Sequence, residues 1–116
     1  MEHDAFSFEK LEVFRVAREA LAAHVAVRAC FRGLPGEIAP QLERALVSVV
    51  ANIAEGAGRE SRADQRRHYT IARGSAQEAA AILSIAELYV VVPEETRVLM
   101  RKRLLSTVKM LFALAR

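Results

Sequence analysis

Hydrophobic residues recur at intervals of three and four along most of the chain, which is the spacing of a helix with one apolar face. Glycine and proline gather at a few positions and divide this pattern into four stretches. We therefore predict four helices, over residues 8–32, 38–57, 62–91 and 94–115.

Residue types that start or stop helices lie at the ends of these stretches. Ser7 and Ser61 are suitable N-caps, and Ser61 opens a capping-box pattern. Pro93 is preset for the first turn of the last helix. The glycine-containing segments 33–36 and 56–58 end the first and second helices.

The apolar faces identify the candidate core. In the first helix this face comprises Phe8, Leu11, Phe14, Ala17, Leu21, Val25 and Phe31. In the second it comprises Ile38, Leu42, Ala45, Leu46, Val49, Ile53 and Gly56. In the third it comprises Gln65, His68, Tyr69, Ala72, Ala76, Ala79, Leu83 and Ala86.

Long helices joined by loops of about two to six residues favour antiparallel neighbours. The expected architecture is therefore all-α, an up-down-up-down four-helix bundle in one domain over residues 1–116. The alternative is an open array of helices that completes its core against other subunits.

Composition narrows the class of protein further. Of the 116 residues 53% are hydrophobic, so the chain can bury a core without disulfide or metal. The single Cys30 indicates a reducing compartment, and the acidic residues 1–4 lack the character of a secretory signal. The longest uncharged runs are about ten residues, against roughly 20 for a bilayer span. We therefore expect a cytoplasmic protein with no membrane partner.

Positive charge is concentrated near the C-terminal end. Residues 1–58 carry six basic and eight acidic side chains, residues 59–96 carry five and six, and residues 97–116 carry six and none. The last helix therefore holds the whole basic excess. Such a helix is typical of a platform for phosphate or an acidic partner, and equally of a solvated face whose cations suit the helix C-terminus.

A second basic group lies at the start of the third helix. Arg62, Arg66 and Arg73 fall within about 40° of one another on the helical wheel. Arginines beside an aromatic ring are the composition of a nucleic-acid contact. The alternative is a solvated flank that neighbouring acids neutralise. The predicted contact residues are Arg59, Arg62, Arg66, Tyr69, Arg73, Lys102 and Lys109.

Two cations of the last helix fall on its apolar side. Arg97 and Arg101 share that side with Leu104, Val108, Leu111 and Phe112. An inward arginine needs a partner, so we expect these two either to pair with carboxylates at one end of the bundle or to face another subunit. The alternative is that their side chains snorkel to water.

No pattern in the chain indicates catalysis. The three histidines lie far apart, and no Glu-x-x-His motif supplies a di-metal site. Cys30 has no CxxC partner, His24 is interpreted as a residue on a helix face, and the Gly56–Gly58 segment lacks the strand and third glycine of a dinucleotide loop. We expect no catalytic residue, no metal and no cofactor, and hence no enzyme.

A polar ridge interrupts the apolar second helix. Ser48, Asn52 and Glu55 are spaced by four and three residues, and Ser75 and Glu78 repeat the three-residue step in the third helix. Buried polar groups must find partners. We interpret the ridge as a hydrogen-bonded network that fixes helix register, with Gly74 allowing close approach. The alternative is a polar site at the bundle edge or between subunits.

Several of these residues belong to sequence runs that resemble a known protein family. The run Ser-Val-Val-Ala-Asn-Ile-Ala-Glu-Gly at 48–56, the Ile-Ala-Arg-Gly-Ser run at 71–75 and the opening Phe-Glu-Lys-Leu-Glu-Val-Phe at 8–14 resemble the 23S rRNA-intervening-sequence family of bacterial four-helix-bundle proteins. That family is similar to the accessory variability determinant proteins of diversity-generating retroelements. The match covers nearly the whole chain.

The resemblance implies a ring-like homopentamer with a basic surface. The retroelement relatives bind nucleic acid and a partner reverse transcriptase, so RNA, DNA and such an enzyme are the implied partners. The signature positions, which we interpret as structural, are Asn52, Glu55, Gly56, Gly74, Ser75 and Glu78. This chain departs from the family at Val50, where proline is usual, and at Gln65 and His68, where aromatic or aliphatic residues are usual.

Three functions follow as hypotheses. The leading one is a non-enzymatic, homo-oligomeric accessory factor that binds nucleic acid through basic residues of the third and fourth helices. The second is a self-assembling structural or protein-interaction scaffold that binds no nucleic acid. The third is an enzyme with a site at the polar ridge, which would need a pocket and strongly perturbed carboxylates.

Overall fold

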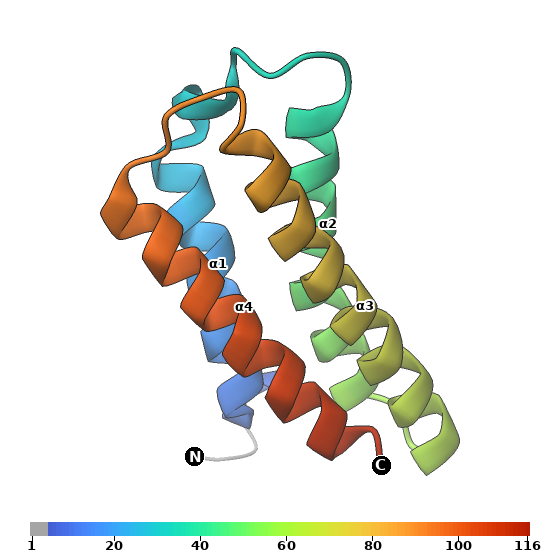
Figure 1. The fold of residues 1–116 in the computed structure, drawn as a ribbon. Helices are drawn as coiled ribbons and strands as arrows, with labels where there is room; N and C mark the ends of the chain where they lie inside the picture. The colour runs from blue at the N-terminus through green and yellow to red at the C-terminus, as the bar shows by residue number, and fades with distance from the viewer. Residues whose placement is uncertain (1–4) are drawn as a thin grey trace.

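The computed structural model describes residues 5–116, so the acidic start and His3 lie outside the described residues. Within that range the chain is all-α, with four long helices, short 3-10 segments and no strand (Figure 1). The elements are η2 (Ser7–Lys10), α1 (Glu12–Ala26), η3 (Arg28–Phe31), α2 (Ile38–Ala57), α3 (Arg62–Ala86) and α4 (Glu94–Leu114).

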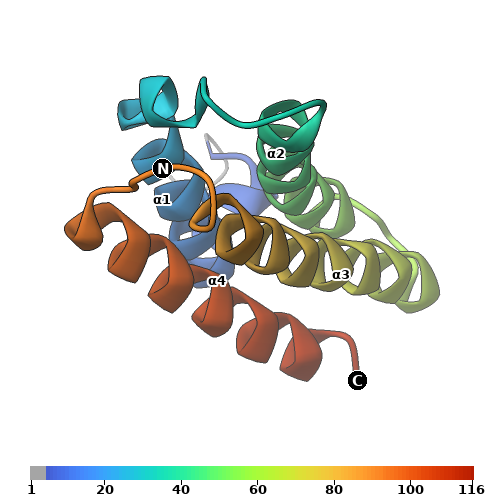
Figure 2. The ribbon, with the colours of Figure 1, turned by 45° about the horizontal axis from the view of Figure 1, so that its top comes forward.

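Successive long helices run in alternating directions, as the colours of Figure 1 show. The closest packing joins α2 to α3, and α4 packs against both α1 and α3. Contact between α1 and α2 is the least extensive of the four neighbouring pairs. Figure 2 shows α2 and α4 on opposite sides of the molecule. No helix in the described residues combines the length and apolar character needed to cross a membrane.

Large apolar side chains from all four helices meet between them. The largest fully buried ones are Phe31, Leu42, Leu46, Ile53, Met100, Leu104 and Leu111. Burying one such side chain stabilises the fold by roughly 1.5–3 kcal/mol. α3 contributes mainly alanines, of which Ala72, Ala76 and Ala79 are fully buried. Small side chains there let α2 and α4 approach the α3 backbone closely.

The prediction of one continuous helix over residues 8–32 is wrong, because the chain leaves the helical conformation at two residues. Leu11 has an extended backbone (φ −88°, ψ 125°) and separates η2 from α1, and Val27 (φ −119°, ψ 22°) separates α1 from η3. The buried residues of α1 are Val13, Val16, Ala17, Ala20 and His24. Of the predicted face, Phe14 and Leu21 are partly buried and Val25 is exposed, so α1 is rotated about its axis relative to the prediction. The turn at Val27 brings the Phe31 ring onto the His24 ring, with centroids 4.9 Å apart.

The predicted N-cap at Ser7 is also wrong. Ser7 lies inside the first turn, and Phe6 occupies the cap position. The Glu9 carboxylate accepts a hydrogen bond of 2.8 Å from the Phe6 N–H, which satisfies one free donor of the turn. At α3 the prediction is confirmed, because the Asp64 N–H donates to Ser61 Oγ at 3.1 Å.

The predicted third helix, 62–91, is five residues too long. α3 ends at Ala86, and the chain then turns so that Val92 is buried and Val90 lies over Gly33. Two physical reasons act together. β-Branched valines are weak helix formers, and Pro93 disfavours a helical conformation in the residue before it. The bounds of α2 agree with the prediction, and α4 ends one residue before the predicted end.

Candidate nucleic-acid interface

Three of the predicted contact residues are exposed cations on α3 and α4. Arg66, Lys102 and Lys109 are exposed, and none forms an ion pair with a residue in the described part of the chain. Within residues 5–116 no carboxylate therefore neutralises their charge. We call Arg66, Lys102 and Lys109 the free cations of this surface.

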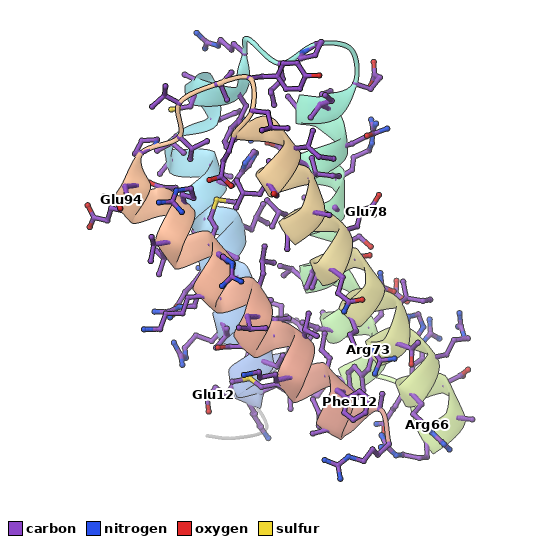
Figure 3. The ribbon with its side chains drawn as sticks, viewed as in Figure 1. Glu12, Arg66, Arg73, Glu78, Glu94 and Phe112 are labelled. Atoms are coloured by element: carbon purple, nitrogen blue, oxygen red, sulfur yellow. The ribbon has the colours of Figure 1, made fainter. Side chains whose placement is uncertain are left out.

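Arg73 and Phe112 form the bridge between the two helices of this surface. The Arg73 guanidinium carbon lies 5.2 Å from the centroid of the Phe112 ring, a cation–π contact. Figure 3 shows both side chains near the C-terminal end of α4, with Arg66 beyond them on α3. The Phe112 ring is 58% exposed, although its position on the helical wheel had placed it with the apolar side of α4. Arg73 thus contacts the Phe112 ring and is still partly exposed to solvent.

Arg62 has a structural partner that spacing did not reveal. Its Nη2 donates to the backbone carbonyl oxygens of Leu114 and Arg116, the latter at 2.8 Å. Carbonyls at a helix C-terminus lack intrahelical donors and carry partial negative charge, so a guanidinium suits them. Arg62 therefore fastens the end of α4 to the start of α3, and it is separated from these partners by more than 50 residues.

Two further predicted contact residues, Tyr69 and Arg59, already have partners within the protein. Tyr69 is 5% exposed, and burial raises the pKa of its hydroxyl. A ring buried in this way cannot stack on a base, so Tyr69 is removed from the predicted contact set. Arg59 remains exposed but pairs with the Glu55 carboxylate at 2.9 Å.

The outward face of α4 mixes cations with apolar side chains. Residues three, four and seven apart share a helix face. The exposed residues on this face are Val98, Lys102, Leu105, Lys109 and Phe112. Three of the five are apolar, which is unusual for a surface in contact with water alone.

Arg97 and Arg101 have different environments. The prediction of a carboxylate partner at the end of the bundle is confirmed for Arg97, whose Nε lies 3.2 Å from Glu87 Oε1. Arg101 is exposed and lines a small cleft of about 230 Å³ between α3 and α4, and among residues 5–116 it has no ion pair. An unforeseen pair joins Arg103 Nε to Glu19 Oε1 at 2.7 Å. Arg103 is the main reason that the pKa of Glu19 is lowered.

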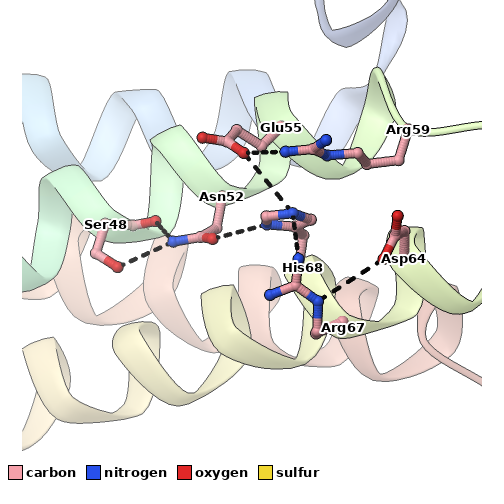
Figure 4. Close-up of polar contacts among 7 residues, drawn as sticks. All are labelled: Ser48, Asn52, Glu55, Arg59, Asp64, Arg67 and His68. Carbon is pink, nitrogen blue, oxygen red and sulfur yellow. Dashed lines mark hydrogen bonds and ion pairs between the residues drawn. The ribbon is translucent and has the colours of Figure 1, made fainter.

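The polar ridge of α2 is a network that crosses to α3 (Figure 4). Ser48 Oγ and Ser75 Oγ are 2.9 Å apart, and Asn52 Nδ2 donates to the Ser48 carbonyl at 2.9 Å. Asn52 Oδ1 lies 3.1 Å from His68 Nδ1, so this nitrogen is the donor. His68 Nε2 is then the acceptor for Arg67, whose Nη2 is 3.3 Å away. The network joins the two helices in one register.

Not every predicted member belongs to this network. Glu78 is exposed and has no polar contact to another described residue, so its assignment is wrong. A Cβ at Gly74 would meet no atom within 4 Å, so Gly74 serves no close approach. Glu55 lies at the edge, with Oε2 3.7 Å from His68 Nε2. His68 had been assigned to the apolar face, and no periodic signal links it to a residue 16 positions away.

A groove between α1 and α2 was not foreseen. It has a volume of about 850 Å³ and is lined by His24, Arg28, Phe31, Arg32, Ala39, Pro40, Glu43, Arg44, Val47 and Ser48. Glu43 Oε1 lies 2.8 Å from Arg28 Nε and 3.0 Å from His24 Nε2. Arg28 is the main reason that the pKa of Glu43 is lowered.

His24 is part of the core rather than of a simple helix face. It is 1% exposed, and burial lowers its pKa while the neighbouring Glu43 acts in the opposite direction. The Nε2–H group donates to Glu43, and Nδ1 has no hydrogen-bond partner among the described residues. No three His, Cys, Asp or Glu side chains within residues 5–116 are grouped as ligands for a metal ion.

Comparison with known proteins identifies the family. Residues 9–113 match the sequence model of the family described as 23S rRNA-intervening sequence protein. Among curated proteins, no sequence matches the chain. The family match covers nine-tenths of the chain, including the polar ridge and both basic helices. The chain therefore belongs to the 23S rRNA-intervening sequence protein family.

Proposed function

We propose that this protein is a non-enzymatic homo-oligomer that binds nucleic acid through the α3–α4 surface and acts as an accessory factor. The observation that carries the proposal is the presence of three exposed cations, Arg66, Lys102 and Lys109, that no carboxylate of the described chain neutralises. Contacts between such side chains and phosphates supply affinity that does not depend on sequence.

Two further features support the proposal. Residues 97–116 carry six basic and no acidic side chains, so the potential around α4 is positive. The exposed Phe112 ring beneath Arg73 offers a flat apolar surface beside the cations, as proteins that bind single strands use. The family resemblance implies five copies in a ring, and a ring would repeat this surface and raise the effective affinity.

The experiment that tests the proposal is anisotropy binding to a structured RNA and to a matched DNA duplex between about 50 and 200 mM salt. Several phosphate contacts change affinity by orders of magnitude over this range. The variant is Lys102→Glu with Lys109→Glu, because both side chains are exposed and neither supports the fold. Arg62 is unsuitable because its substitution would also release the end of α4.

The matched control is Lys10→Glu with Arg18→Glu, two exposed cations on η2 and α1. It changes the net charge by the same amount. We expect the α4 variant to lose binding by at least tenfold and to flatten the salt dependence, and the control to change affinity much less. Equal losses in both variants, or no binding of the wild type at the lowest salt, would contradict the proposal.

A second candidate is a self-assembling scaffold without nucleic-acid binding. The observation that favours it is the apolar character of exposed positions on α4, where Val98 and Leu105 are each nearly half exposed. Such positions are typical of protein–protein contacts. The same titration distinguishes the two candidates, because an assembled protein that binds neither RNA nor DNA at low salt is the scaffold.

A further inference from the structure

The α1–α2 groove has an apolar floor and a basic rim. Phe31, Ala39, Pro40 and Val47 line it, and Val47 is 47% exposed. Three guanidinium groups lie around it, on Arg28, Arg32 and Arg44. Arg28 pairs with Glu43 at 2.8 Å and Arg44 with Glu37 at 3.6 Å. Arg32 is exposed and has no ion pair to another described residue.

The connection from α3 to α4 carries the two most exposed large apolar side chains of the described chain, Val91 and Leu88, and the exposed ring of Tyr89. Leu88 is 83% exposed, Tyr89 58% and Val91 90%. We call Leu88, Tyr89 and Val91 the apolar tip. Their neighbours Val90 and Val92 are packed into the protein, over Gly33 and in the core respectively. The backbone of the connection is thereby anchored, and the apolar tip faces away from its own core.

The surroundings of the apolar tip are acidic. Glu87 precedes it, and Glu94 and Glu95 follow it at the start of α4. Arg97 pairs with Glu87 and Glu94, at 3.2 and 3.6 Å, whereas Glu95 is exposed and unpaired among residues 5–116. An acidic, apolar projection thus exists on the same chain as a basic, apolar groove.

We propose that the groove between α1 and α2 receives the apolar tip of a second copy of this chain. Shape and charge both carry this inference. The groove is concave and basic at its rim, while the tip projects and is flanked by acids, and opposite charges across an interface fix its orientation. The inference rests on the proposed homo-oligomerisation and names the surfaces that make it.

The placement of the two surfaces determines the type of assembly. Figure 1 shows the α3–α4 connection at the same end of the bundle as the start of α2, where the groove lies. Tip and groove are different surfaces, so each copy uses its tip on one neighbour and its groove on the other. Such a heterologous contact closes into a ring or continues as a filament, depending on the rotation between copies.

The test uses sedimentation to measure the mass of the full chain and of two variants. The tip variant is Leu88→Arg with Val91→Arg, and the groove variant is Val47→Arg. All three positions are exposed, so folding should survive, and circular dichroism checks it. We expect each variant alone to sediment as a single chain. The control is Ile71→Arg on α3, an isoleucine about as exposed as Val47 that belongs to neither surface, and it should assemble like the wild type.

Mixing the two variants gives the decisive result. The tip variant keeps its groove and the groove variant keeps its tip, so an equal mixture should form a one-to-one pair and nothing larger. Failure of the mixture to pair would overturn the inference. The inference would also be overturned if both variants assembled like the wild type, or if Ile71→Arg alone disrupted assembly. Either result would leave homo-oligomerisation in place. A wild type that sediments as a single chain would overturn both.

Discussion

His24 is a titratable residue held almost without access to water. Its Nε2–H donates to Glu43 at 3.0 Å, and its ring stacks on Phe31. Burial disfavours the charged ring and is the main influence on its pKa, which is lowered. Glu43 works against burial, but Arg28 neutralises that carboxylate at 2.8 Å and adds a smaller repulsion of its own.

We expect the free energy of unfolding to decrease as the pH falls from about 7.5 to 5.5. Below its ordinary pKa of about 6.5, His24 binds a proton more readily in the unfolded chain than in the folded one. The contribution of His24 to the free energy of unfolding is therefore fully present above that pH and is lost as the pH falls to the pKa of the folded state. Each unit by which folding lowers the pKa corresponds to about 1.4 kcal/mol. Urea unfolding at several pH values measures this.

The comparison variant is His24→Phe, which keeps an aromatic ring on Phe31 and leaves Glu43 with Arg28. We expect it to have a smaller decrease in stability over the same pH range, whatever its stability at neutral pH. Its pH dependence is the relevant quantity, because carboxylates with lowered pKa values, such as Glu43, contribute mainly below about pH 5. If the free energy of unfolding of His24→Phe decreased with pH as steeply as that of the wild type, the pH dependence could not be assigned to His24.

Packing of α2 on α3 involves a glycine and a polar network at neighbouring positions. Gly56 is buried in the last turn of α2, where a Cβ would lie 2.7 Å from Tyr69 Cε1 and 3.1 Å from His68 Cβ. One turn earlier in α2, Asn52 bonds to His68. The family signature glycines therefore differ in role, since Gly56 meets a partner helix and Gly74 meets open space.

We expect Gly56→Ala and Gly74→Ala to have opposite effects on stability. The first substitution overpacks the contact with Tyr69 and should cost about 1–3 kcal/mol. The second places alanine at an exposed helical position with no atom in its way, and should add about 0.4–1 kcal/mol. Urea midpoints of the two variants and the wild type measure both. An equal effect of the two substitutions would contradict the assigned roles.

In the whole molecule, two features bear on assembly. They are the limited contact between α1 and α2 and the exposed apolar connection between α3 and α4. The α1–α2 pair packs less extensively than its neighbours, and a groove of about 850 Å³ lies beside it, lined by His24 of α1, the η3 segment and α2. If a second copy fills that groove, assembly adds burial that the single chain lacks. Folding and assembly are then coupled through mass action.

We expect the melting temperature to rise with protein concentration. A tenfold change in the concentration of a binding partner changes the free energy of association by about 1.4 kcal/mol, which corresponds to several degrees for a domain of this size. Melting curves followed by circular dichroism at two concentrations measure the rise. The variant Leu88→Arg with Val91→Arg should melt at a temperature that does not depend on concentration, and a wild type with that behaviour would show that assembly does not stabilise the fold.

Local signals in the sequence were enough to predict four helices and most of their ends. Side chains three and four residues apart share a helix face, so the apolar period, the Ser61 cap and Pro93 act within one or two turns. The excess of cations in the last helix and the runs that identify the family are likewise readable from the chain alone.

Contacts between helices were decided by the tertiary structure. Packing buried His24 of α1 and left Val25 exposed, and it buried Tyr69, which removed that ring from the surface. Arg62 and Arg103 found partners on another helix, while Arg66 has none among residues 5–116. Which cation faces a carboxylate and which faces water depends on how each helix is rotated and crossed against its neighbours. That rotation is a property of packing in three dimensions, and a one-dimensional period leaves it open.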